Sequence, residues 1–327
     1  MAIKGDQVQL RLSSYRLQQR IATSTYGEVW RADDEHGQQV ALKLINTARM
    51  RQTDNEWHAR WIMAAHKEIL FLRSLSPWDE RHIVRLIDDG LHEGLPVLAL
   101  ELMASDLAQY LRQKPATPLA RCLQWLAQIN QALAKMHQVG WRYLDLKPAN
   151  LLLSHDGNTL KLADFGTSRR NPRPGLRLEA QQRAARHAYR GTANWQAPEQ
   201  FFPLTGTDED GQFCTDTRTD YFALGALFYY LITQGLPLRF CSLCGQLFKQ
   251  QQGNVPSQTA LPPTLYPDEE HLFMNMIDSA TDQPGTLARS ALALLKQLLA
   301  PCPQQRPAHA LAIARQIDGL LARLHAA

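Results

Sequence analysis

The sequence lacks a long apolar run, a secretory signal and an excess of either charge. Its longest apolar run, Tyr221 to Ile232, is well short of the roughly 20 residues that a membrane-spanning helix needs, so we expect a buried core helix there and no membrane anchor. The N-terminal segment MAIKGDQVQLRLSS has no apolar signal core. The 35 Lys and Arg residues nearly balance the 31 Asp and Glu residues, and a net charge of +4 is too small to indicate a nucleic-acid partner.

Cysteine is also scarce. The five cysteines, an odd number, favour a reducing compartment, so we expect a cytoplasmic protein, with non-classical secretion as the alternative. Cys241 and Cys244 have the spacing of a metal or redox pair, but a structural zinc site needs four ligands and the sequence contains no second pair. We therefore interpret these two residues as a buried pair on a helix.

Composition and length define the broad class. Hydrophobic residues make up 45% of the chain and charged residues 20%, as in an ordinary globular protein, which excludes a mainly disordered chain and a coiled coil. Single hydrophobic cores stop growing near ~250–300 residues. A chain of 327 residues is therefore either one large bilobal domain or two domains.

The first third of the chain has the pattern of a small sheet with one long helix. We predict strands at 15–22, 28–31, 38–45, 82–88 and 97–102, and a helix at 54–74. Alternation divides the side chains of strand 38–45 between two faces, of which one carries Val40, Leu42 and Leu44 and the other carries Ala41, Lys43 and Ile45. One narrow arc of the helix holds Trp57, Trp61, Ala64, Glu68 and Leu72. A carboxylate thus lies on the apolar face of this helix.

Helical patterns dominate from about residue 103 onward. We predict helices at 106–113, 119–138, 220–234, 286–300 and 307–325, short strands at 151–153 and 160–163, and a long loop at 167–195. The predicted fold class is therefore α+β, with a small β-rich part that contains one long helix and a larger, mainly helical part.

Short motifs follow one another with a characteristic order and spacing: VALK at 40–43, Glu68, LDLKPAN at 144–150, DFG at 164–166 and APE at 197–199. Together they resemble the signature set of the eukaryotic-like serine/threonine protein kinase family, whereas any one of them alone is weak evidence. The resemblance implies a single bilobal kinase domain over 1–327. Its N-lobe is expected at about 12–102, its hinge at about 101–105 and its C-lobe at about 106–326.

The pairing of Lys43 with Glu68 also has a physical basis. Lys43 shares its strand face with apolar residues, so it must meet an anion or remain exposed. Glu68 lies among tryptophans on its helix, and a buried carboxylate needs a cation because an unpaired buried charge is strongly destabilising. In the family that the chain resembles, such a pair orients the lysine onto the α- and β-phosphates of ATP.

The resemblance assigns a role to each polar residue of the later motifs. Asp145 is expected to accept the proton of the substrate hydroxyl, and Lys147 to neutralise charge on the transferring phosphoryl group. Asn150 and Asp164 are the expected ligands of Mg²⁺, or of Mn²⁺ in its place. The expected catalytic set is Lys43, Glu68, Asp145 and Lys147. The expected ATP contacts are Ile21, Ala22, Thr23, Ser24, Thr25, Tyr26, Gly27, Val29, Ala41, Lys43, Leu100, Glu101, Met103, Asn150 and Asp164.

The phosphate loop, residues 21–29, departs from the family pattern because Gly27 is the only glycine that it keeps. Ala22 and Ser24 are small enough for close approach of the backbone to phosphate, but they are less permissive in φ than glycine. The sequence of this loop favours a weakened nucleotide affinity, and the loop alone would be no evidence of nucleotide binding.

The catalytic loop departs as well, with Tyr143 and Leu144 where the family usually has His and Arg, as in kinases of the non-RD type. Tyr143 can fill the apolar space of the His, but Leu144 cannot supply the missing guanidinium. By resemblance, Glu199 is expected to pair with Arg306, and Asp220 is expected to brace the backbone of the catalytic loop.

The segment 167–190 is rich in arginine and contains one acid, Glu179. Its composition fits docking of an acidic substrate or of phosphate groups, and equally a solvated loop. Its arginines are Arg169, Arg170, Arg173, Arg177, Arg183, Arg186 and Arg190. By resemblance, it belongs to an activation segment that ends at APE, whose expected phosphate acceptors are Thr167, Ser168, Tyr189 and Thr192. The stretch PLTGTDEDGQFCTDT at 203–217 is interpreted as an inserted acidic surface loop.

Three functions compete. The leading one is ATP-dependent phosphoryl transfer to Ser or Thr of protein substrates, including autophosphorylation, because the six polar residues of the motifs are all retained. Lys147 and Thr192 resemble the Ser/Thr branch of the family. The first alternative is a pseudokinase scaffold, which the phosphate loop and the Tyr143–Leu144 change favour. The second is a small-molecule kinase of related fold, which the stretch GTANWQAPE at 191–199 argues against.

Overall fold

The computed structural model describes residues 2–24, 26–113, 116–170, 195–201, 216–250, 262–281 and 285–325. The chain divides into two compact units. The first, here called the sheet unit, comprises Met1–Ser105, Leu152–Gly157 and Lys161–Gly166. The second, the helical unit, comprises Asp106–Leu151, Asn158–Leu160 and Thr167–Ala327.

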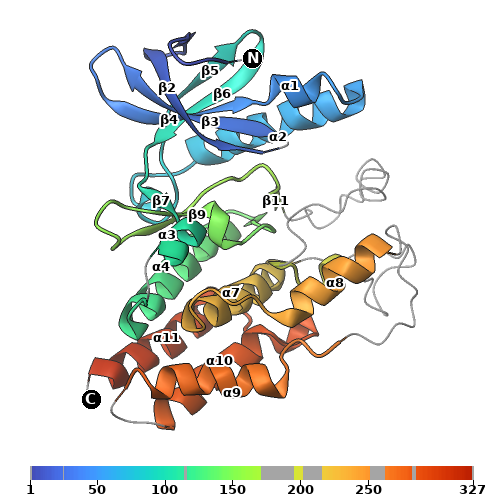
Figure 1. Ribbon diagram of the computed structural model, residues 1–327. Helices are drawn as coiled ribbons and strands as arrows, with labels where there is room; N and C mark the ends of the chain where they lie inside the picture. The colour runs from blue at the N-terminus through green and yellow to red at the C-terminus, as the bar shows by residue number, and fades with distance from the viewer. Residues whose placement is uncertain are drawn as a thin grey trace. The chain divides into compact units, whose positions relative to one another are not determined.

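An antiparallel sheet of order β1-β2-β3-β4-β6-β5 forms most of the sheet unit (Figure 1). Its strands are β1 (Gln7–Gln9), β2 (Ser14–Thr23), β3 (Gly27–Asp34), β4 (Gln39–Ile45), β5 (Leu86–His92) and β6 (Leu95–Glu101). Glu93 and Gly94 join β5 to β6 as a two-residue hairpin turn, and both have positive φ, 51° and 77°. Such turns match the twist of the strands that they connect.

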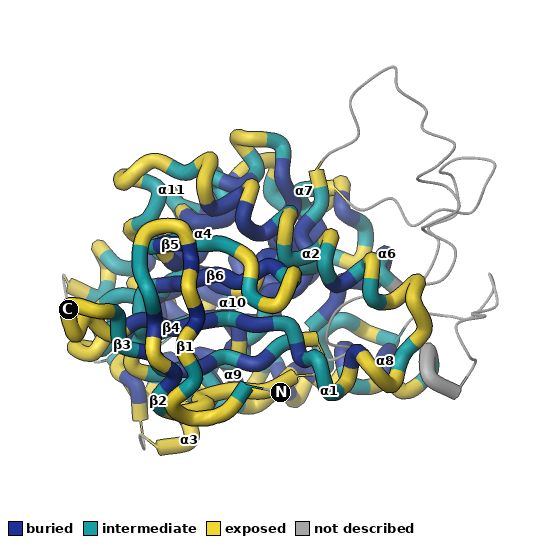
Figure 2. The backbone as a smooth tube through the Cα atoms, turned by 90° about the horizontal axis from the view of Figure 1, so that it is seen from above, coloured by how far each residue is buried: buried dark blue, intermediate teal, exposed yellow. Residues whose placement is uncertain are grey.

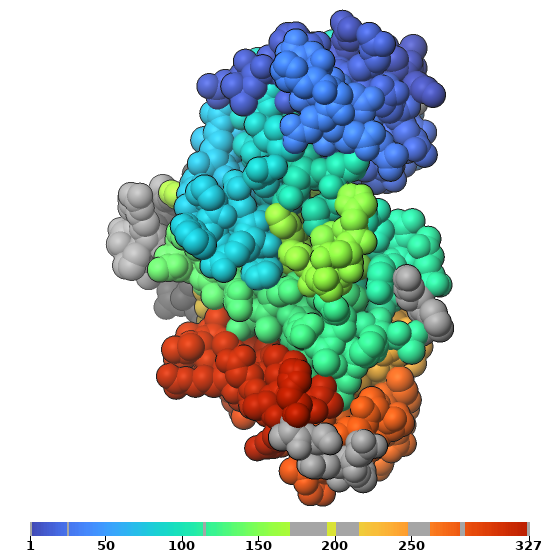
Figure 3. Space-filling view, turned by 90° about the vertical axis from the view of Figure 1, so that its left-hand side faces the viewer, coloured from blue at the N-terminus to red at the C-terminus, as the bar shows by residue number. Residues whose placement is uncertain are grey.

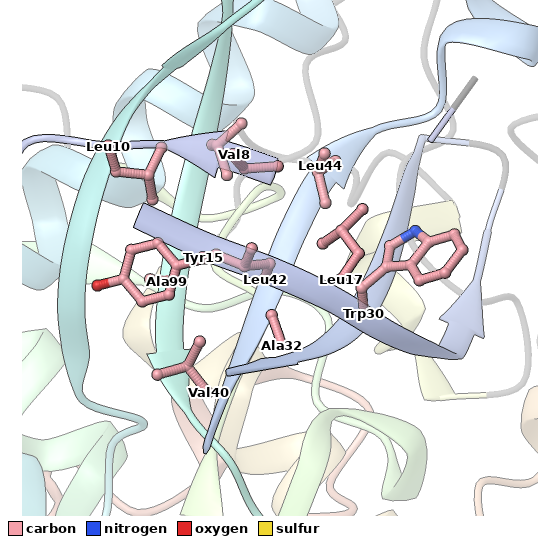
Figure 4. Close-up of a cluster of buried hydrophobic side chains, with 11 residues drawn as sticks. Val8, Leu10, Tyr15, Leu17, Trp30, Ala32, Val40, Leu42, Leu44 and Ala99 are labelled. Carbon is pink, nitrogen blue, oxygen red and sulfur yellow. The ribbon is translucent and has the colours of Figure 1, made fainter. Parts of the chain in front are cut away.

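One face of this sheet forms a hydrophobic core (Figure 4). Val40, Leu42 and Leu44 of β4 all point into it, which confirms the alternation predicted from the sequence. Leu17 and Trp30 of the neighbouring strands complete the same layer. Figure 2 shows that burial is greatest along the central strands β4 and β6, whereas the hairpin end of β5 is exposed.

Strand β1 was not predicted, because the N-lobe was expected to begin at about residue 12. It pairs with β2 and adds Val8, which is fully buried, to the core. The segment after β1 is held by Asp88, whose buried carboxylate accepts hydrogen bonds from the backbone N–H of Leu12 at 2.9 Å and of Ser13 at 3.3 Å. The N-terminal segment is therefore an integral part of the sheet unit.

Two helices and one 3-10 turn lie between β4 and β5: α1 (Thr47–Met50), α2 (Asn55–Arg73) and η1 (Asp79–Arg81). Helix α2 packs on β5 and β6 and buries Trp61 and Glu68, as its periodicity predicted. Trp57 departs from that prediction, since it is 39% exposed and lies against the guanidinium of Arg60. The apolar face of α2 thus begins one turn later than the sequence indicated.

The helical unit is organised around α7 (Thr217–Ile232), which is buried on almost every side. Helices α4, α9 and α10 pack on it. Helix α11 packs along α4, and Figure 3 shows its red surface beside the green surface of α4. A Cβ on Gly225 of α7 would lie 2.8 Å from the Cβ of Leu298, so glycine permits the close approach of α10. The other helices are α3 (Leu107–Gln113), α4 (Leu119–Gln138), α6 (Pro198–Phe201), α8 (Arg239–Gln250), α9 (Pro267–Asp278), α10 (Thr286–Leu298) and α11 (Ala310–His325).

The remaining elements are short. The division between the two units passes through strands β7, β9 and β10, which form a sheet of order β10-β9-β7. A two-stranded sheet pairs β8 with β11. These elements are β7 (Ser105–Asp106), β8 (Trp141–Arg142), β9 (Leu151–Leu153), β10 (Leu160–Leu162), β11 (Arg169–Arg170), η2 (Pro148–Asn150) and η4 (Pro303–Gln305).

The mixed α+β class is confirmed, and α4 has the predicted bounds. Helix α9 was not predicted, and α8 was expected only as the helical stretch that carries Cys241 and Cys244. Almost all of the acidic stretch 203–217 lies outside the described residues, as do residues 171–194 of the arginine-rich segment. Over the described part of the chain, every helix is too short or too polar to cross a membrane.

Candidate active site

The second face of the sheet carries several of the predicted ATP contacts. Strand register pairs Lys43 with Val29 on one side and with Leu98 on the other, and it pairs Ala41 with Leu100. Paired residues in an antiparallel sheet point to the same face, as do residues two positions apart along a strand. Val29, Ala41, Lys43 and Leu100 therefore share the face opposite the hydrophobic core.

Lys43 is the centre of a charged cluster in the sheet unit. Its Nζ lies 2.8 Å and 3.0 Å from the two carboxylate oxygens of Glu68 and 2.8 Å from Oδ1 of Asp164. Glu68 is buried, and the backbone N–H of Phe165 donates to it at 3.3 Å. The side chain of Asp164 is 49% exposed. The predicted ion pair is thus formed, and the aspartate of the DFG motif shares the same ammonium.

The electrostatics of this cluster favour a bound cation. Burial opposes the charge of Lys43, but attraction by Asp164 and Glu68 outweighs it and raises the pKa of the ammonium group. Burial raises the pKa of Glu68, and the Lys43 ammonium opposes that rise. Two carboxylates share one ammonium here, so the ionised cluster has a net negative charge. Asp164 also has φ of 59°, a left-handed conformation uncommon for a residue other than glycine.

The other predicted ATP contacts of the sheet unit lie in the phosphate loop and at the end of β6. In the phosphate loop, Ile21, Ala22, Thr23, Ser24 and Tyr26 are exposed, whereas Thr25 lies outside the described residues. Gly27 lies in a tight place, because a Cβ there would lie 3.1 Å from the carbonyl oxygen of Leu44.

At the end of β6, Glu101 and Met103 are partly exposed. The carboxylate of Glu101 accepts hydrogen bonds from Lys161 at 2.6 Å and from the backbone N–H of Arg85 at 2.7 Å. The side chain of Glu101 therefore braces the end of β6.

The catalytic loop lies in the helical unit and is internally bonded. Lys147 Nζ lies 2.9 Å from Oδ2 of Asp145. The side-chain amide of Asn150 donates to the carbonyl oxygen of Asp145 at 2.9 Å and to its carboxylate at 3.1 Å. Asp145 and Asn150 are both buried. The structure thus places the three predicted residues of this loop in one cluster.

Asp220 of α7 braces this loop, as predicted. Its carboxylate accepts hydrogen bonds from the backbone N–H of Tyr143 at 2.8 Å and of Leu144 at 2.7 Å, and His137 lies 2.8 Å away on the same carboxylate. The ring of Tyr143 is fully buried, as expected for a residue that fills the place of a histidine. Leu144 has φ of 68°, so its backbone is held in the left-handed region that normally suits glycine.

Gln200 is a site residue that the sequence analysis missed. Its side-chain amide donates to the carbonyl oxygen of Leu144 at 3.3 Å, and its amide oxygen accepts from the backbone N–H of Ala197 at 2.9 Å. Both polar groups of the Leu144 backbone are therefore bonded by side chains, one from Asp220 and one from Gln200. Only the position of Gln200, directly after APE, could have signalled this role.

Glu199 and Arg306 form the predicted pair, and the side chains of both are 0% exposed. The guanidinium binds both carboxylate oxygens, at 2.6 Å and 2.8 Å. Its remaining donors bind the carbonyl oxygens of Ala300, Pro301 and Arg218. Each N–H of the arginine thus has an acceptor, which is the condition for burying a charge without a large penalty.

Two further predictions concern cysteine and the activation segment. Cys241 and Cys244 are fully buried on α8, which confirms the interpretation as a helical pair, and across the described residues no cluster of three potential ligands could hold a metal ion. Ser168, one of the expected phosphate acceptors, is fully buried with its hydroxyl 3.4 Å from the carbonyl oxygen of Tyr143. It is therefore inaccessible in this conformation, and Tyr189 and Thr192 lie outside the described residues.

Comparison with known proteins shows the family of the chain. A family model described as the protein kinase domain matches residues 15–317. The chain is 27% identical over 262 residues to serine/threonine-protein kinase PknL of Mycobacterium tuberculosis, covering 80% of this chain and 59% of the relative. It is 31% identical over 263 residues to cyclin-dependent kinase 20 of Danio rerio, and the match covers 77% of this chain and 68% of the relative. Serine/threonine-protein kinase PkaA of Streptomyces coelicolor is 31% identical over 271 residues, and the match covers 78% of this chain and 45% of the relative.

The chain therefore belongs to the protein kinase family, and its β-rich and helical parts are those of a protein kinase domain. The chain spans about three-fifths of the length of PknL and less than half of that of PkaA.

Proposed function

We propose that this protein transfers the γ-phosphoryl group of ATP to serine or threonine hydroxyls of protein substrates, and that residues 1–327 act as a single kinase domain. The observation that carries the proposal is the cluster in which Lys43 is held by Glu68 and Asp164, each within 3.0 Å. Surface lysines are not normally held between two carboxylates, one of them buried. An ammonium fixed in this way is suited to orient the α- and β-phosphates of a nucleotide.

The residues of the two clusters can account for the transfer step. The hydroxyl oxygen of the acceptor forms a bond to the γ-phosphorus, the bond from that phosphorus to the bridging oxygen of ADP breaks, and Asp145 accepts the hydroxyl proton. Lys147, whose Nζ lies 2.9 Å from Asp145, would offset negative charge on the transferring group. Positioning and electrostatic stabilisation dominate such a reaction.

Each of the two expected ligands offers an oxygen atom that suits a magnesium ion, or manganese in its place. Asp164 offers a half-exposed carboxylate, and Asn150 uses its amide nitrogen toward Asp145, which leaves its amide oxygen as an acceptor. Oxygen atoms of carboxylates and amides are the ligands that Mg²⁺ prefers. When bound, the ion would neutralise charge on the β- and γ-phosphates.

The substrate class follows from the segment that ends at Glu199. Its burial against Arg306 anchors the chain where peptide substrates dock in protein kinases, which favours a protein over a small molecule. Lys147 favours Ser/Thr over Tyr acceptors. The arginines of 169–190 favour an acidic substrate, although only Arg169 and Arg170 lie within the described residues.

The four described cysteines are free thiols, which suits a cytoplasmic, reducing setting.

A nucleotide-binding scaffold without transfer is the second candidate, and the phosphate loop with its single glycine favours it. The deciding experiment is transfer of label from γ-labelled ATP to the protein itself and to an added acidic Ser/Thr peptide. Asp145→Asn should reduce transfer at least ~10²-fold while Mg–ATP still raises the melting temperature. Asp164→Ala should abolish that Mg²⁺-dependent rise.

Equal transfer by the Asp145→Asn variant and the wild type would refute the active-kinase proposal. Phospho-amino-acid analysis of the labelled product should give phosphoserine or phosphothreonine. Mainly phosphotyrosine would contradict the proposed acceptor class.

A further inference from the structure

The turn of the phosphate loop is closed by the side chain of Ser24. The Oγ of Ser24 accepts hydrogen bonds from the backbone N–H of Tyr26 at 3.3 Å and of Gly27 at 3.0 Å. The backbone N–H of Ser24 donates to the carbonyl oxygen of Gly27 at 2.8 Å. A serine hydroxyl that bonds local backbone groups in this way offers the chain a fixed turn. The loop is thus ordered by a side chain rather than left free by glycines.

Asn46, which follows the last residue of β4, fastens this turn to the sheet unit. Its side-chain amide donates to the carbonyl oxygen of Ser24 at 3.0 Å, and its backbone N–H donates to the carbonyl oxygen of Tyr26 at 3.2 Å. Its amide oxygen accepts from the backbone N–H of Arg49 and so caps α1. Asn46 is only 6% exposed, although it lies between a loop and a helix start. One buried asparagine therefore joins the phosphate loop, the end of β4 and the start of α1.

Tyr26 adds a contact to the helix that carries Glu68. Its ring meets that of Trp61 edge to face, with ring centroids 5.3 Å apart and an interplanar angle of 88°. Trp61 is buried on α2, two turns before Glu68. The tip of the phosphate loop is thus supported by the same helix that holds the Lys43 ammonium.

We propose that Asn46 is a positioning residue for the phosphates of the bound nucleotide, acting through the phosphate loop. The inference rests on the proposed function, because it assumes that the loop covers a nucleotide. A loop with several glycines is free to adapt to a phosphate, whereas this loop keeps one glycine and must be held near the bound conformation beforehand. Preorganisation of this kind raises affinity because less disorder is lost on binding.

The amide donor of Asn46 can be removed while its capping role is kept. Asp and Ser both cap helices well, so Asn46→Asp and Asn46→Ser keep an acceptor for the Arg49 N–H but lose the bond to Ser24. One lost hydrogen bond predicts a rise of about 5- to 10-fold in the Kd for Mg–ATP. The Kd for adenosine should change less than about 2-fold, because adenosine has no phosphate for the loop to meet.

The matched control is Asn130 of the helical unit, another buried asparagine whose side-chain amide donates to a backbone carbonyl, that of Ala310 at 2.9 Å. Asn130→Asp should lower the melting temperature and leave both Kd values unchanged. A purely structural role for Asn46 would give the same pattern as this control.

The measurements are titration calorimetry for Mg–ATP, competition for adenosine, and melting temperature for every variant. Asn46→Ser is the decisive variant, because Asn46→Asp also adds a negative charge that repels phosphate. An ATP-to-adenosine affinity ratio that Asn46→Ser leaves unchanged would overturn the proposal. If both variants fail to fold, Tyr26→Ala decides, since its exposed side chain supports the same loop and its loss should lower the ratio in the same direction. Because binding is measured without transfer, an inactive wild type would refute the proposed function and leave this test intact.

Discussion

Arg306 and Glu199 are 107 residues apart in the chain, yet they form a bidentate ion pair from which solvent is excluded. The guanidinium also lies 5.1 Å from the ring centroid of Phe222 on α7. The pair thus ties the segment that carries APE to the centre of the helical unit. Its two partners should matter for stability and for the position of the catalytic loop beyond.

We predict that Arg306→Met lowers the free energy of unfolding by about 3–5 kcal/mol, because it leaves the carboxylate of Glu199 buried without a cation. The double variant Glu199→Leu/Arg306→Met should be more stable than either single variant, since no charge is then left unpaired. Urea unfolding measures both effects. Lys296→Ala, which removes the exposed partner of Glu270 in the same unit, serves as the control and should leave the midpoint nearly unchanged. If the single and double variants lost the same free energy of unfolding, the result would argue against a charge effect.

Asp220→Asn should slow transfer without weakening nucleotide binding. The carboxylate accepts from two backbone N–H groups of the catalytic loop, and an amide can offer only one oxygen to them. We expect kcat to fall at least ~10-fold and the KM for ATP to change less, because the bonds of Asp220 hold Tyr143 and Leu144, next to Asp145 and away from the expected nucleotide contact Asn150. Initial rates on one peptide substrate give both values.

The control for Asp220→Asn is Asp216→Ala on the same helix. Asp216 caps α7 through its bond to the N–H of Arg218, so its loss should cost about 1 kcal/mol of stability. If that variant lowers kcat as much as Asp220→Asn does, the effect of Asp220 would reflect helix stability and not positioning.

The buried thiols should resist modification. Burial raises the pKa of Cys122 and of Cys244 to about 12 and raises that of Cys241 as well, so thiolate is scarce near pH 8. Among the described cysteines, iodoacetamide at pH 8 should label Cys302 first, and the other three only after unfolding in urea. Peptide mass spectrometry reads each site. Early labelling of Cys241 in the folded protein would contradict its burial.

The same shifts give the pH dependence a sign. The ordinary thiol pKa is about 8.5, so unfolded thiols ionise first as the pH rises, while the folded ones keep their protons. The unfolded state is then favoured, and the free energy of unfolding should fall from about pH 9 toward pH 12. Replacing Cys122 and Cys244 together by Ala should flatten this fall, which urea titrations at pH 8 and pH 10.5 can show.

Periodicity predicted the parts of the site that lie on regular elements. Lys43 and Glu68 each occupied an apolar face, and a buried charge requires a partner, so the pair followed from the two patterns. The pair of Glu199 with Arg306 could come only from family resemblance, because no local pattern links residues so far apart. Strand β1 was not predicted for the same reason. Its short run QVQ has no period, and its position depends on the distant Asp88.

Two other features that were not predicted have signals in the local sequence. Helix α9 begins with Pro267 followed by Asp268, Glu269 and Glu270, which is a strong start signal that the sequence analysis passed over. Asn46 precedes a short helix in the position of a capping residue, whereas its bond to Ser24 depends on the fold and has no local sequence signal. Both cases show that capping chemistry predicts structure where hydrophobic periodicity is weak.

The last prediction concerns regulation. In kinases with an arginine before the catalytic aspartate, phosphate on the activation segment pairs with that arginine and orders the segment. Here Leu144 replaces it, and its backbone is instead held by Asp220 and Gln200. The nearby Arg142 is buried and donates to the carbonyl oxygen of Arg170 at 3.2 Å, so its guanidinium is committed to the backbone of β11. We therefore predict that activity depends little on phosphorylation of this segment.

The comparison is between phosphatase-treated and autophosphorylated enzyme, with initial rates measured on one exogenous substrate. We expect the two rates to agree within about 3-fold, since no new charge pair at residue 144 can form. A fall of more than ~10-fold on dephosphorylation, about 1.4 kcal/mol of transition-state stabilisation, would mean that another cation has taken over. Arg142→Ala should then abolish the effect of phosphate. Conversely, Leu144→Arg should make the rate depend on phosphorylation, because it restores the cation that a phosphate on this segment would meet.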